Sequence, residues 1–501
     1  MRQLSKSKIL AYRQCPKRLW LEIHRPELKD DSAAEAVYQI GNEVGDVARK
    51  IYDMEGKGVL IDFKEIGYDE AFAKSAELLR QGSGPIFEAG LTMPGALAFA
   101  DVMLPERSGK ALRWHMIEVK AASGVKDHYP EDIAVQAYIA EAAGVGLASV
   151  SLAHVDSSFV YRGDGDYKGL LKEVDFTQAA ASRRGEVEEW LAGAHAVAEL
   201  ADEPAIAMGG QCTTPHVCAF CDYCGRDAAA AEFPLTSLPN FSGRRKVAVE
   251  AMGITDLRDV PDEYLTRTQK WVRDVTRSGE TYLDAAGAAA DLAGLGFPAR
   301  FLDFESVMLA VPIWKGTRPY QQIPFQFSLH HLDESGSLTH EPFLDLSGND
   351  PSEPLAQALI AGCGDHGPVF AYNAAFEKMV MRALGARFPE YEPALLRIIA
   401  RVVDLLPIAK ARFYDPSQHG RWGLKSILPA VCPELSYDHL TGVADGAMAV
   451  VAFRDAINPE TTPERKAEIE KELLAYCHLD TLGLVRLWER FGGGGNVVSL
   501  E

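Results

Sequence analysis

Apolar positions recur along this chain with two periods, one typical of strands and one of helices. Residues 96–105 (ALAFADVMLP) and 112–122 (LRWHMIEVKAA) predict two strands joined by a polar turn. Residues 36–53 repeat apolar side chains at helical spacing, and 132–144 predict a second helix before a strand at 147–155. The first part of the chain is therefore expected to form a small α/β core.

The same patterns return near residue 299. Residues 299–307 (ARFLDFESV) and 324–333 (PFQFSLHHLD) predict strands, and 368–388 predict a buried strand that continues into a helix. The last strong helical pattern spans 464–491. Strands followed by helices that carry acidic residues favour a second α/β sheet.

The length of 501 residues is too great for one hydrophobic core. We expect a first domain at 1–226, a helical connector at 227–298 and a further domain at 299–501. No apolar run approaches the roughly 20 residues of a membrane span, and the first residues lack the apolar stretch of a signal peptide. A cytoplasmic protein without a membrane partner is therefore expected.

The net charge of −20 changes the expectation about partners. It argues against a uniformly basic surface for nucleic acid. It does not exclude nucleic acid, because divalent ions held by carboxylates supply positive charge locally.

The cysteines form a bracket around the first part of the chain. One of them lies within residues 5–23, a predicted helix with Ser5 or Ser7 as its N-cap. Five of the eight cysteines make up the bracket: Cys15, Cys212, Cys218, Cys221 and Cys224. In a cytoplasmic chain this favours metal binding over disulfides. A [4Fe–4S] cluster takes four thiolates, and structural zinc also takes four ligands, with His216 close enough to join. The spacing leaves open the choice of metal. Cys15, Cys212 and Cys218 are expected ligands, and the choice between Cys221 and Cys224 stays open.

A carboxylate site is predicted inside the bracket. Glu118 and Lys120 alternate along a strand, so both side chains point to one face. Asp101 would arrive from the neighbouring strand. Two carboxylates can hold Mg²⁺ or Mn²⁺, and the lysine can stabilise charge that develops at phosphorus.

The D…ExK site and its bracket resemble the PD-(D/E)XK nucleases of the RecB-like, CRISPR-associated exonuclease type, over roughly residues 1–226. The resemblance implies a restriction-endonuclease-like domain with a [4Fe–4S] cluster held by one N-terminal and three later cysteines. Such nucleases usually carry a histidine in the early helix, where this chain has Gly45. Glu43 or Glu88 is then a candidate for an additional metal ligand. Gln136 is a further candidate, in an altered form of the usual Q-x-x-x-Y pattern.

A second set of acids begins at Asp303. Asp303 and Glu305 alternate on one strand and share a face. Glu377 lies at a strand-to-helix junction, and Tyr476 and Asp480 are four apart on one helical face. Four acids around two Mg²⁺ ions can activate water and stabilise the leaving 3′ oxygen, and the tyrosine can position that water.

The motifs DFE, N-x-x-F-[D/E] and Y-x-x-x-D occur here in the order of the DEDDy class of 3′–5′ exonucleases, and the chain resembles that class over about residues 299–490. The resemblance implies a ribonuclease-H-like domain. Glu377 stands where the class usually has Asp, so Asp404 is an additional candidate ligand. His478 is not at the spacing from Asp480 that the histidine variant of this class has. Tyr476 is therefore the residue expected to position the water. The whole chain resembles an uncharacterised bacterial family of fused nucleases.

The sequence thus predicts a metal-dependent DNA exonuclease with two sites, acting on single-stranded DNA ends. RNA is the competing substrate. A second hypothesis is a nucleic-acid-binding iron–sulfur scaffold in which one or both sites are inactive.

Overall fold

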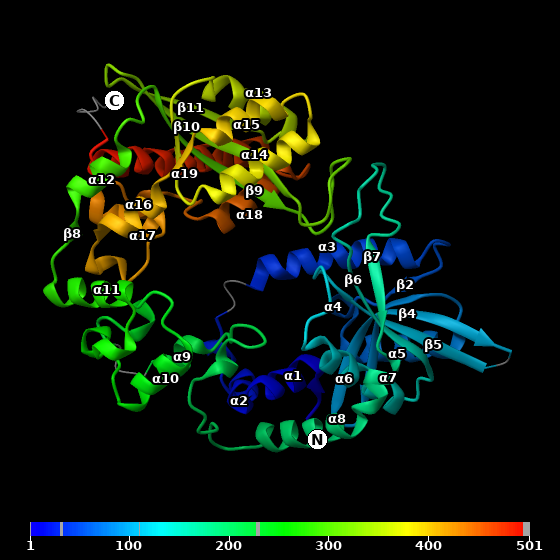
Figure 1. Cartoon of the computed structure of the whole chain (residues 1–501). Coiled ribbons are helices and arrows are strands. Elements are labelled where there is room, and N and C mark those ends of the chain that lie inside the picture. The colour runs from blue at the N-terminus through cyan, green and yellow to red at the C-terminus, as the bar shows by residue number, and fades with distance from the viewer. Residues whose placement is uncertain (1, 31–33, 110, 227–230, 494–501) are drawn as a thin grey trace. The chain divides into compact units, whose positions relative to one another are not determined.

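The computed structural model describes residues 2–30, 34–109, 111–226 and 231–493. The chain forms two compact units, residues 1–229 with 309–321 and residues 230–308 with 322–501. Figure 1 colours the chain by residue number. Each unit contains a mixed β-sheet with helices, so the α/β class expected from the sequence is confirmed. Among the residues described, no helix is long and apolar enough to cross a membrane.

The sheet of the first unit has the order β2-β3-β4-β5-β6-β7, and β1 pairs with β4. Strands β3, β4 and β5 are antiparallel neighbours, whereas β5 and β6 are parallel and are joined through the helix α6. The bounds are β1 Leu4–Ser5, β2 Val59–Leu60, β3 Ile86–Met93, β4 Ala96–Ser108, β5 Ala111–Lys120, β6 Leu147–Val155 and β7 Leu171–Asp175.

Helices cover both faces of this sheet. Helix α6 packs between the sheet and the helices α1, α7 and α8, and its apolar residues, such as Ile133 and Ile139, are fully buried. Val44 and Val47 of α3 pack with Val155 in a separate cluster. The helices are α1 Lys6–Gln14, α2 Pro16–His24, α3 Ala34–Tyr52, α4 Phe63–Ile66, α5 Tyr68–Gln81, α6 Tyr129–Ala142, α7 Thr177–Ser182, α8 Arg184–Ala198 and α9 Cys221–Gly225.

The N-terminal helix differs from the prediction of one helix over 5–23. Ser5 is the N-cap, as expected, and its hydroxyl accepts from the Lys8 amide. The helix ends at Cys15, whose backbone is extended, and α2 starts at Pro16. Proline lacks an amide donor and restricts the residue before it, so a helix breaks and a new one begins there. The break places Cys15 at a junction between two helices.

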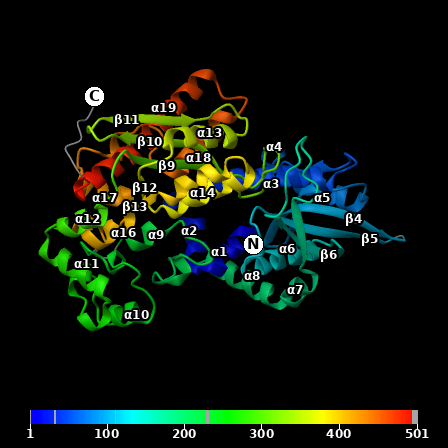
Figure 2. The same cartoon turned by 45° about the horizontal axis from the view of Figure 1, so that its top comes forward.

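The sheet of the second unit has the order β11-β10-β9-β12-β13. Its strands lie in the upper part of Figure 2. Strands β9, β10 and β11 are antiparallel, and β9, β12 and β13 are parallel. The bounds are β9 Ala299–Met308, β10 Gln322–Leu332, β11 Leu338–Leu344, β12 Val369–Ala371 and β13 Val402–Asp404, with a separate ribbon of β8 Tyr282–Leu283 and β14 Phe413–Tyr414.

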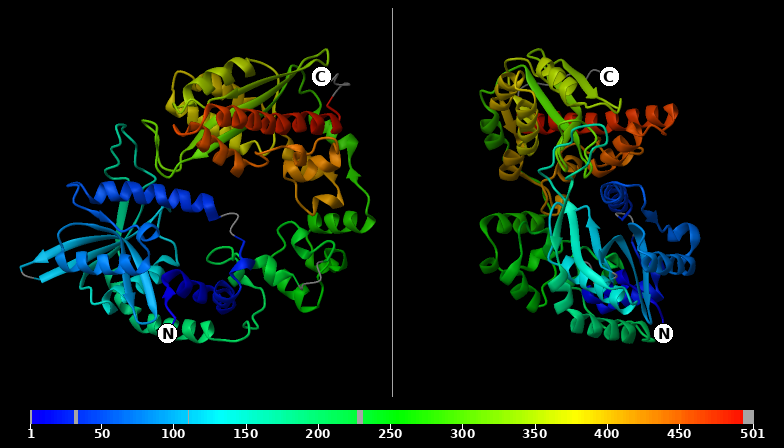
Figure 3. Two further views of the ribbon diagram at one scale, coloured as in Figure 1. Left: turned by 180° about the vertical axis from the view of Figure 1, so that it is seen from behind. Right: turned by 90° about the vertical axis from the view of Figure 1, so that its right-hand side faces the viewer.

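The alternation along β9 separates a core face from a polar face. Leu302 and Phe304 pack with the helices α13 to α15, while Asp303 and Glu305 point to the opposite face. The long helix α19 covers that polar face and runs beside β9, β10 and β11, as both views of Figure 3 show. The helices are α13 Ser352–Cys363, α14 Ala375–Arg387, α15 Glu392–Ala400, α16 Leu405–Arg412, α17 Leu424–Val431, α18 Gly446–Ile457 and α19 Pro463–Arg490.

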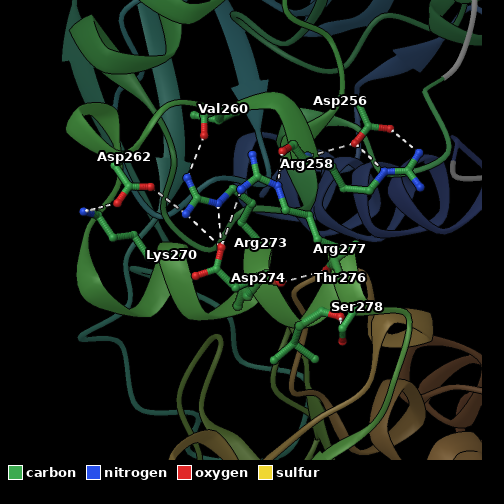
Figure 4. A network of polar contacts seen from close by, with 12 residues as sticks. Asp256, Arg258, Val260, Asp262, Lys270, Arg273, Asp274, Thr276, Arg277 and Ser278 are labelled. Carbon is green, nitrogen blue, oxygen red and sulfur yellow. Dashed lines mark hydrogen bonds and ion pairs between the residues drawn. The ribbon is translucent and has the colours of Figure 1, made fainter.

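The segment before β9 packs into the second unit. It contains α10 Gly243–Ala251, α11 Arg267–Ser278 and α12 Ala285–Leu292, and residues of α11 and α12 share a hydrophobic cluster with Trp488. Arg273 is buried and organises the polar side of α11 (Figure 4). Its guanidinium donates to the Val260 carbonyl at 2.8 Å and pairs with Asp262 at 2.6 Å and Asp274 at 2.8 Å.

Candidate metal centres

Three carboxylates form a row across the first sheet. The pairs Phe87–Val102 and Ala89–Ala100 lie on either side of Glu88 of β3 and Asp101 of β4, and the pair Val102–Ile117 lies next to Asp101 and Glu118 of β5. The charges of Glu118 and Glu88 both raise the pKa of Asp101, so the three carboxylates lie near one another. The Val119 amide donates to Asp101 Oδ2 at 2.6 Å and fixes that carboxylate beside β5. Two predicted ligands, Asp101 and Glu118, are thus brought together, and Glu88 extends their row.

Two lysines and one further acid complete the site. Glu118 Oε1 lies 2.8 Å from Lys6 Nζ and 2.7 Å from Lys120 Nζ. The same two lysines lie 2.9 and 2.7 Å from the two carboxylate oxygens of Asp132. Lys6 comes from the first turn of α1 and Asp132 from the first turn of α6. The predicted pair Glu118 and Lys120 therefore belongs to a four-residue ionic network.

The close contacts within this network keep its side chains charged. Burial alone lowers the pKa of Lys6 and Lys120, but the neighbouring acids outweigh it and the pKa of each is raised. Burial would raise the pKa of Asp132, yet the two lysines hold it below its ordinary value. Both lysines and Asp132 are therefore charged at neutral pH.

The other two carboxyls of the row behave differently. Burial, together with the Glu118 charge, raises the pKa of Asp101 well above its usual range. The pKa of Glu88 is raised by the same two causes. Glu118 Oε2 is buried and has no hydrogen-bond partner among the residues described. A cation beside this oxygen would neutralise the repulsion that lifts these pKa values.

The remaining candidates of the first unit lie on α3 and α6. Gln136 is fully buried one turn after Asp132, and its Oε1 accepts from Lys6 at 2.5 Å. Glu43 is half-buried on α3. Sequence reasoning missed Lys6 and Asp132 as site residues. The one available signal was an aspartate at the head of the apolar run DIAVQAYIA.

The five bracket cysteines come together, and none of them forms a disulfide. They line one cavity with Met208 and Phe220, between the α1–α2 junction and the turn of α9. Burial raises the pKa of Cys218, Cys221 and Cys224. The expected gathering of Cys15 with the four later cysteines is therefore present in the fold.

The spacing of the sulfur atoms bears on the kind of metal. Among the described residues, no three cysteine sulfurs lie within 4.8 Å of one another. A tetrahedral zinc with Zn–S bonds of about 2.3 Å brings its sulfurs to about 3.8 Å apart. The cysteine sulfurs are therefore spaced more widely than a single tetrahedral zinc requires. His216 accepts a hydrogen bond from Arg18 at 3.0 Å.

The second acid cluster is tighter. Ligand oxygens of Asp303, Glu305 and Asp480 all lie within 4.8 Å of one another. The first two come from the polar face of β9 and the third from α19, which covers that face. Burial with the Asp480 charge raises the pKa of Glu305 to about 8, and burial raises that of Asp480 to about 6. The pKa of Asp303 is raised well above its usual range by burial and by the other acids. Such mutual repulsion is what a divalent cation relieves.

Two tyrosines and a lysine border this cluster. Tyr437 donates to Asp480 Oδ1 at 2.5 Å, and Tyr476 lies one helical turn before Asp480. Lys425 Nζ lies 5.1 Å from the centre of the Tyr437 ring and 4.9 Å from that of Tyr476. Tyr476 was expected from the sequence, whereas Tyr437 was missed because it lies on a turn outside the motif.

Glu377 and Asp404 have separate roles. Glu377 is 2 % exposed on α14, burial raises its pKa to about 7, and its Oε2 has no hydrogen-bond partner among the residues described. Its charge contributes to the raised pKa of Asp303. Asp404 accepts from the amides of Asn373, Ala374 and Leu406 at 2.9, 3.1 and 2.9 Å. Asp404 therefore holds the turn that leads into the helix of Glu377.

Comparison with protein families gives a match over part of the chain. A family model described as a domain of unknown function, DUF2779, matches residues 300–423. The matched segment contains Asp303, Glu305 and Glu377 but ends before Asp480. A search of curated proteins finds no match for the chain.

Proposed function

We propose that the protein is a metal-dependent nuclease that hydrolyses phosphodiester bonds, with single-stranded DNA ends as the substrate. The observation that carries the proposal is the convergence of Asp303, Glu305 and Asp480, whose ligand oxygens lie within 4.8 Å of one another. Oxygen ligands of this kind suit Mg²⁺ or Mn²⁺. The order of the second sheet, with three antiparallel strands followed by two parallel ones, supports a ribonuclease-H-like domain.

At the second site each protein group has a role that follows from its contacts. Bound divalent ions would polarise the scissile phosphate and lower the pKa of a water. The Tyr437 hydroxyl fixes the orientation of Asp480. Tyr476 is buried beside the acids, which with burial raise its pKa, so its hydroxyl stays protonated and can donate to a water. Lys425 offers positive charge for a phosphate at the same edge.

At the first site Asp101 and Glu118 would hold a divalent ion on the face they share with Glu88. Lys120 is kept charged by Glu118 and Asp132 and would stabilise charge that develops on a phosphate. The row across three strands and the flanking helix α6 support a PD-(D/E)XK-like unit. The five cysteines fit an iron–sulfur cluster that ties α1 and α2 to the segment around α9.

A cleavage assay tests the proposal. Labelled single-stranded DNA, double-stranded DNA and RNA would be incubated with the full chain and Mg²⁺ or Mn²⁺. Asp303→Ala would test the second site, with Glu334→Ala, an exposed acid of the β10–β11 turn, as its control. Lys120→Ala would test the first site, with the exposed Lys172→Ala as its control. The proposal fails if the wild type cuts no substrate with either metal.

One observation favours a second candidate function, a nucleic-acid-binding iron–sulfur scaffold whose first site is inactive, so that any cleavage comes from the second site. Lys6 Nζ contacts both Glu118 and Asp132, so an ammonium group already neutralises Glu118, one of the two acids that would hold a metal. Under this candidate Lys120→Ala leaves cleavage unchanged while Asp303→Ala abolishes it. Under the two-site proposal each variant removes a separate part of the activity.

A further inference from the structure

Three histidine rings from three elements meet beside the second sheet. They are His330 of β10, His340 of β11 and His478 of α19. Their ring centres lie 4.4 to 4.8 Å apart. One ring nitrogen from each lies within 4.8 Å of the others. The fold therefore brings together two histidines of neighbouring strands and His478, which follows them much later in the sequence.

Hydroxyl groups orient two of the three rings. Thr481 Oγ1 lies 2.8 Å from His330 Nδ1, and Ser328 Oγ lies 2.8 Å from His340 Nε2. The two hydroxyls are themselves 2.6 Å apart. Each of these rings thus has one nitrogen engaged by a hydroxyl and a second nitrogen left for another partner. Such outer contacts are typical of histidines that bind metals, because they fix the ring orientation.

The third ring lacks this support. His478 is half-buried, and among the residues described no side chain or backbone group forms a hydrogen bond with its ring. Its ring nitrogens are not among the buried atoms that lack a partner, so solvent reaches them and the ring can take water or a metal ion as its partner. A metal ion at the common point would provide that partner.

Burial keeps the rings of His330 and His340 neutral. Burial, with the neighbouring histidines, lowers the pKa of His330 to about 3 and of His340 to about 4. Arg486 adds a positive charge nearby but is paired with Glu489 at 2.9 Å. Neutral imidazole is the form that binds zinc and other transition metals.

We propose that His330, His340 and His478 form a binding site for one divalent transition metal, with Zn²⁺ as the probe. Imidazole nitrogens suit Zn²⁺, Cu²⁺ or Ni²⁺, whereas carboxylate oxygens suit Mg²⁺ and Mn²⁺. The site is therefore chemically separate from the cluster of Asp303, although both face α19. A metal here would fasten α19, which carries Tyr476 and Asp480, to β10 and β11. The inference does not depend on the nuclease proposal.

The difference in bound zinc between the wild type and each variant tests the site. The full chain would be dialysed against Zn²⁺ with excess Mg²⁺, and the zinc bound per chain would be determined for each variant. His340→Ala and His478→Ala are the test variants. His331→Ala is the matched control, because His331 neighbours His330 on β10 but points to the other face, where it contacts Glu341 at 3.3 Å. Zinc bound at the cysteines is common to all variants and cancels.

We expect the two test variants to bind about one Zn²⁺ fewer per chain than the wild type and His331→Ala. Equal zinc in all four proteins would overturn the proposal. A second measurement does not rely on variants: crystals of the wild type soaked in Zn²⁺ should show an anomalous scattering peak between the three rings. The absence of that peak would also overturn it, even if the variants failed to fold.

Discussion

Lys6 Nζ lies 2.8 Å from Glu118 Oε1, although 112 residues separate the two in the sequence. The contact joins the first turn of α1 to the centre of the first sheet. Lys6 also contacts Asp132, so one ammonium group neutralises two buried carboxylates. The first turn of α1 is therefore part of the first site.

Replacing Lys6 with methionine should destabilise the first unit. Removing one partner from a buried ionic network leaves charge uncompensated, which costs about 3–5 kcal/mol. Lys120 still pairs with both acids, so we expect the lower end, about 3 kcal/mol. Urea unfolding followed by circular dichroism measures the change.

The control for Lys6→Met is Lys172→Met. Lys172 pairs with Asp156 at 2.9 Å, but its side chain is 56% exposed. Surface ion pairs contribute less than about 1 kcal/mol. Equal losses for the two variants would contradict the assignment of Lys6 to a buried network.

Tyr437→Phe should weaken the second site while leaving the fold intact. The hydroxyl that donates to Asp480 would be lost, and a hydrogen bond to a charged group contributes about 1.5–3 kcal/mol. If that bond orients Asp480 for metal binding, the single-turnover cleavage rate should fall roughly 10- to 100-fold. Tyr282→Phe, an exposed tyrosine of β8, is the control. A Tyr437→Phe protein with the wild-type rate would show that Asp480 needs no such support.

The metal-free protein should lose stability as the pH rises. Burial and the Asp480 charge raise the pKa of Glu305 from 4.5 to about 8. The folded state holds this proton more tightly than the unfolded state. The proton's contribution to the free energy of unfolding is therefore fully present below the ordinary pKa of glutamate. It disappears as the pH rises through the folded pKa.

Urea midpoints measured in EDTA between about pH 5 and pH 8 test this linkage. The midpoint of the wild type should fall more steeply than that of Glu305→Gln, and Mg²⁺ should restore it at the higher pH by binding the deprotonated acids. Glu334→Gln should behave as the wild type. Parallel curves for wild type and Glu305→Gln would show that Glu305 does not carry the effect.

The sequence predicted the parts of the sites that lie on regular strands and helices. Alternation put Asp303 beside Glu305, and the sheet placed Glu118 and Lys120 on one strand as expected. Helical spacing put Tyr476 and Asp480 one turn apart. These relations depend only on the geometry of a single element, which the local pattern determines.

Contacts between elements that are far apart in the sequence could not be predicted from local patterns. No local pattern indicates that Lys6 reaches Glu118, or that Tyr437 donates to Asp480 from a short turn. The trio of His330, His340 and His478 likewise depends on the pairing of β10 with β11 and on the position of α19. Such meetings are decided by packing and strand register, and a single sequence does not encode them in any spacing.

Substitution of each bracket cysteine by serine should separate four ligands from one bystander. All five thiols line the same cavity, whereas an iron–sulfur cluster takes four. We expect four of the five variants, purified without oxygen, to lose iron and the brown colour of the cluster, and one to keep both. Cys363→Ser is the control, because Cys363 is fully buried in the core of the second unit, whereas the bracket cysteines belong to the first. The four variants that lose the cluster should also unfold at lower urea, since the cluster ties the α1–α2 junction to the segment around α9. Zinc in place of iron in the wild type would contradict the cluster and the argument from sulfur spacing together.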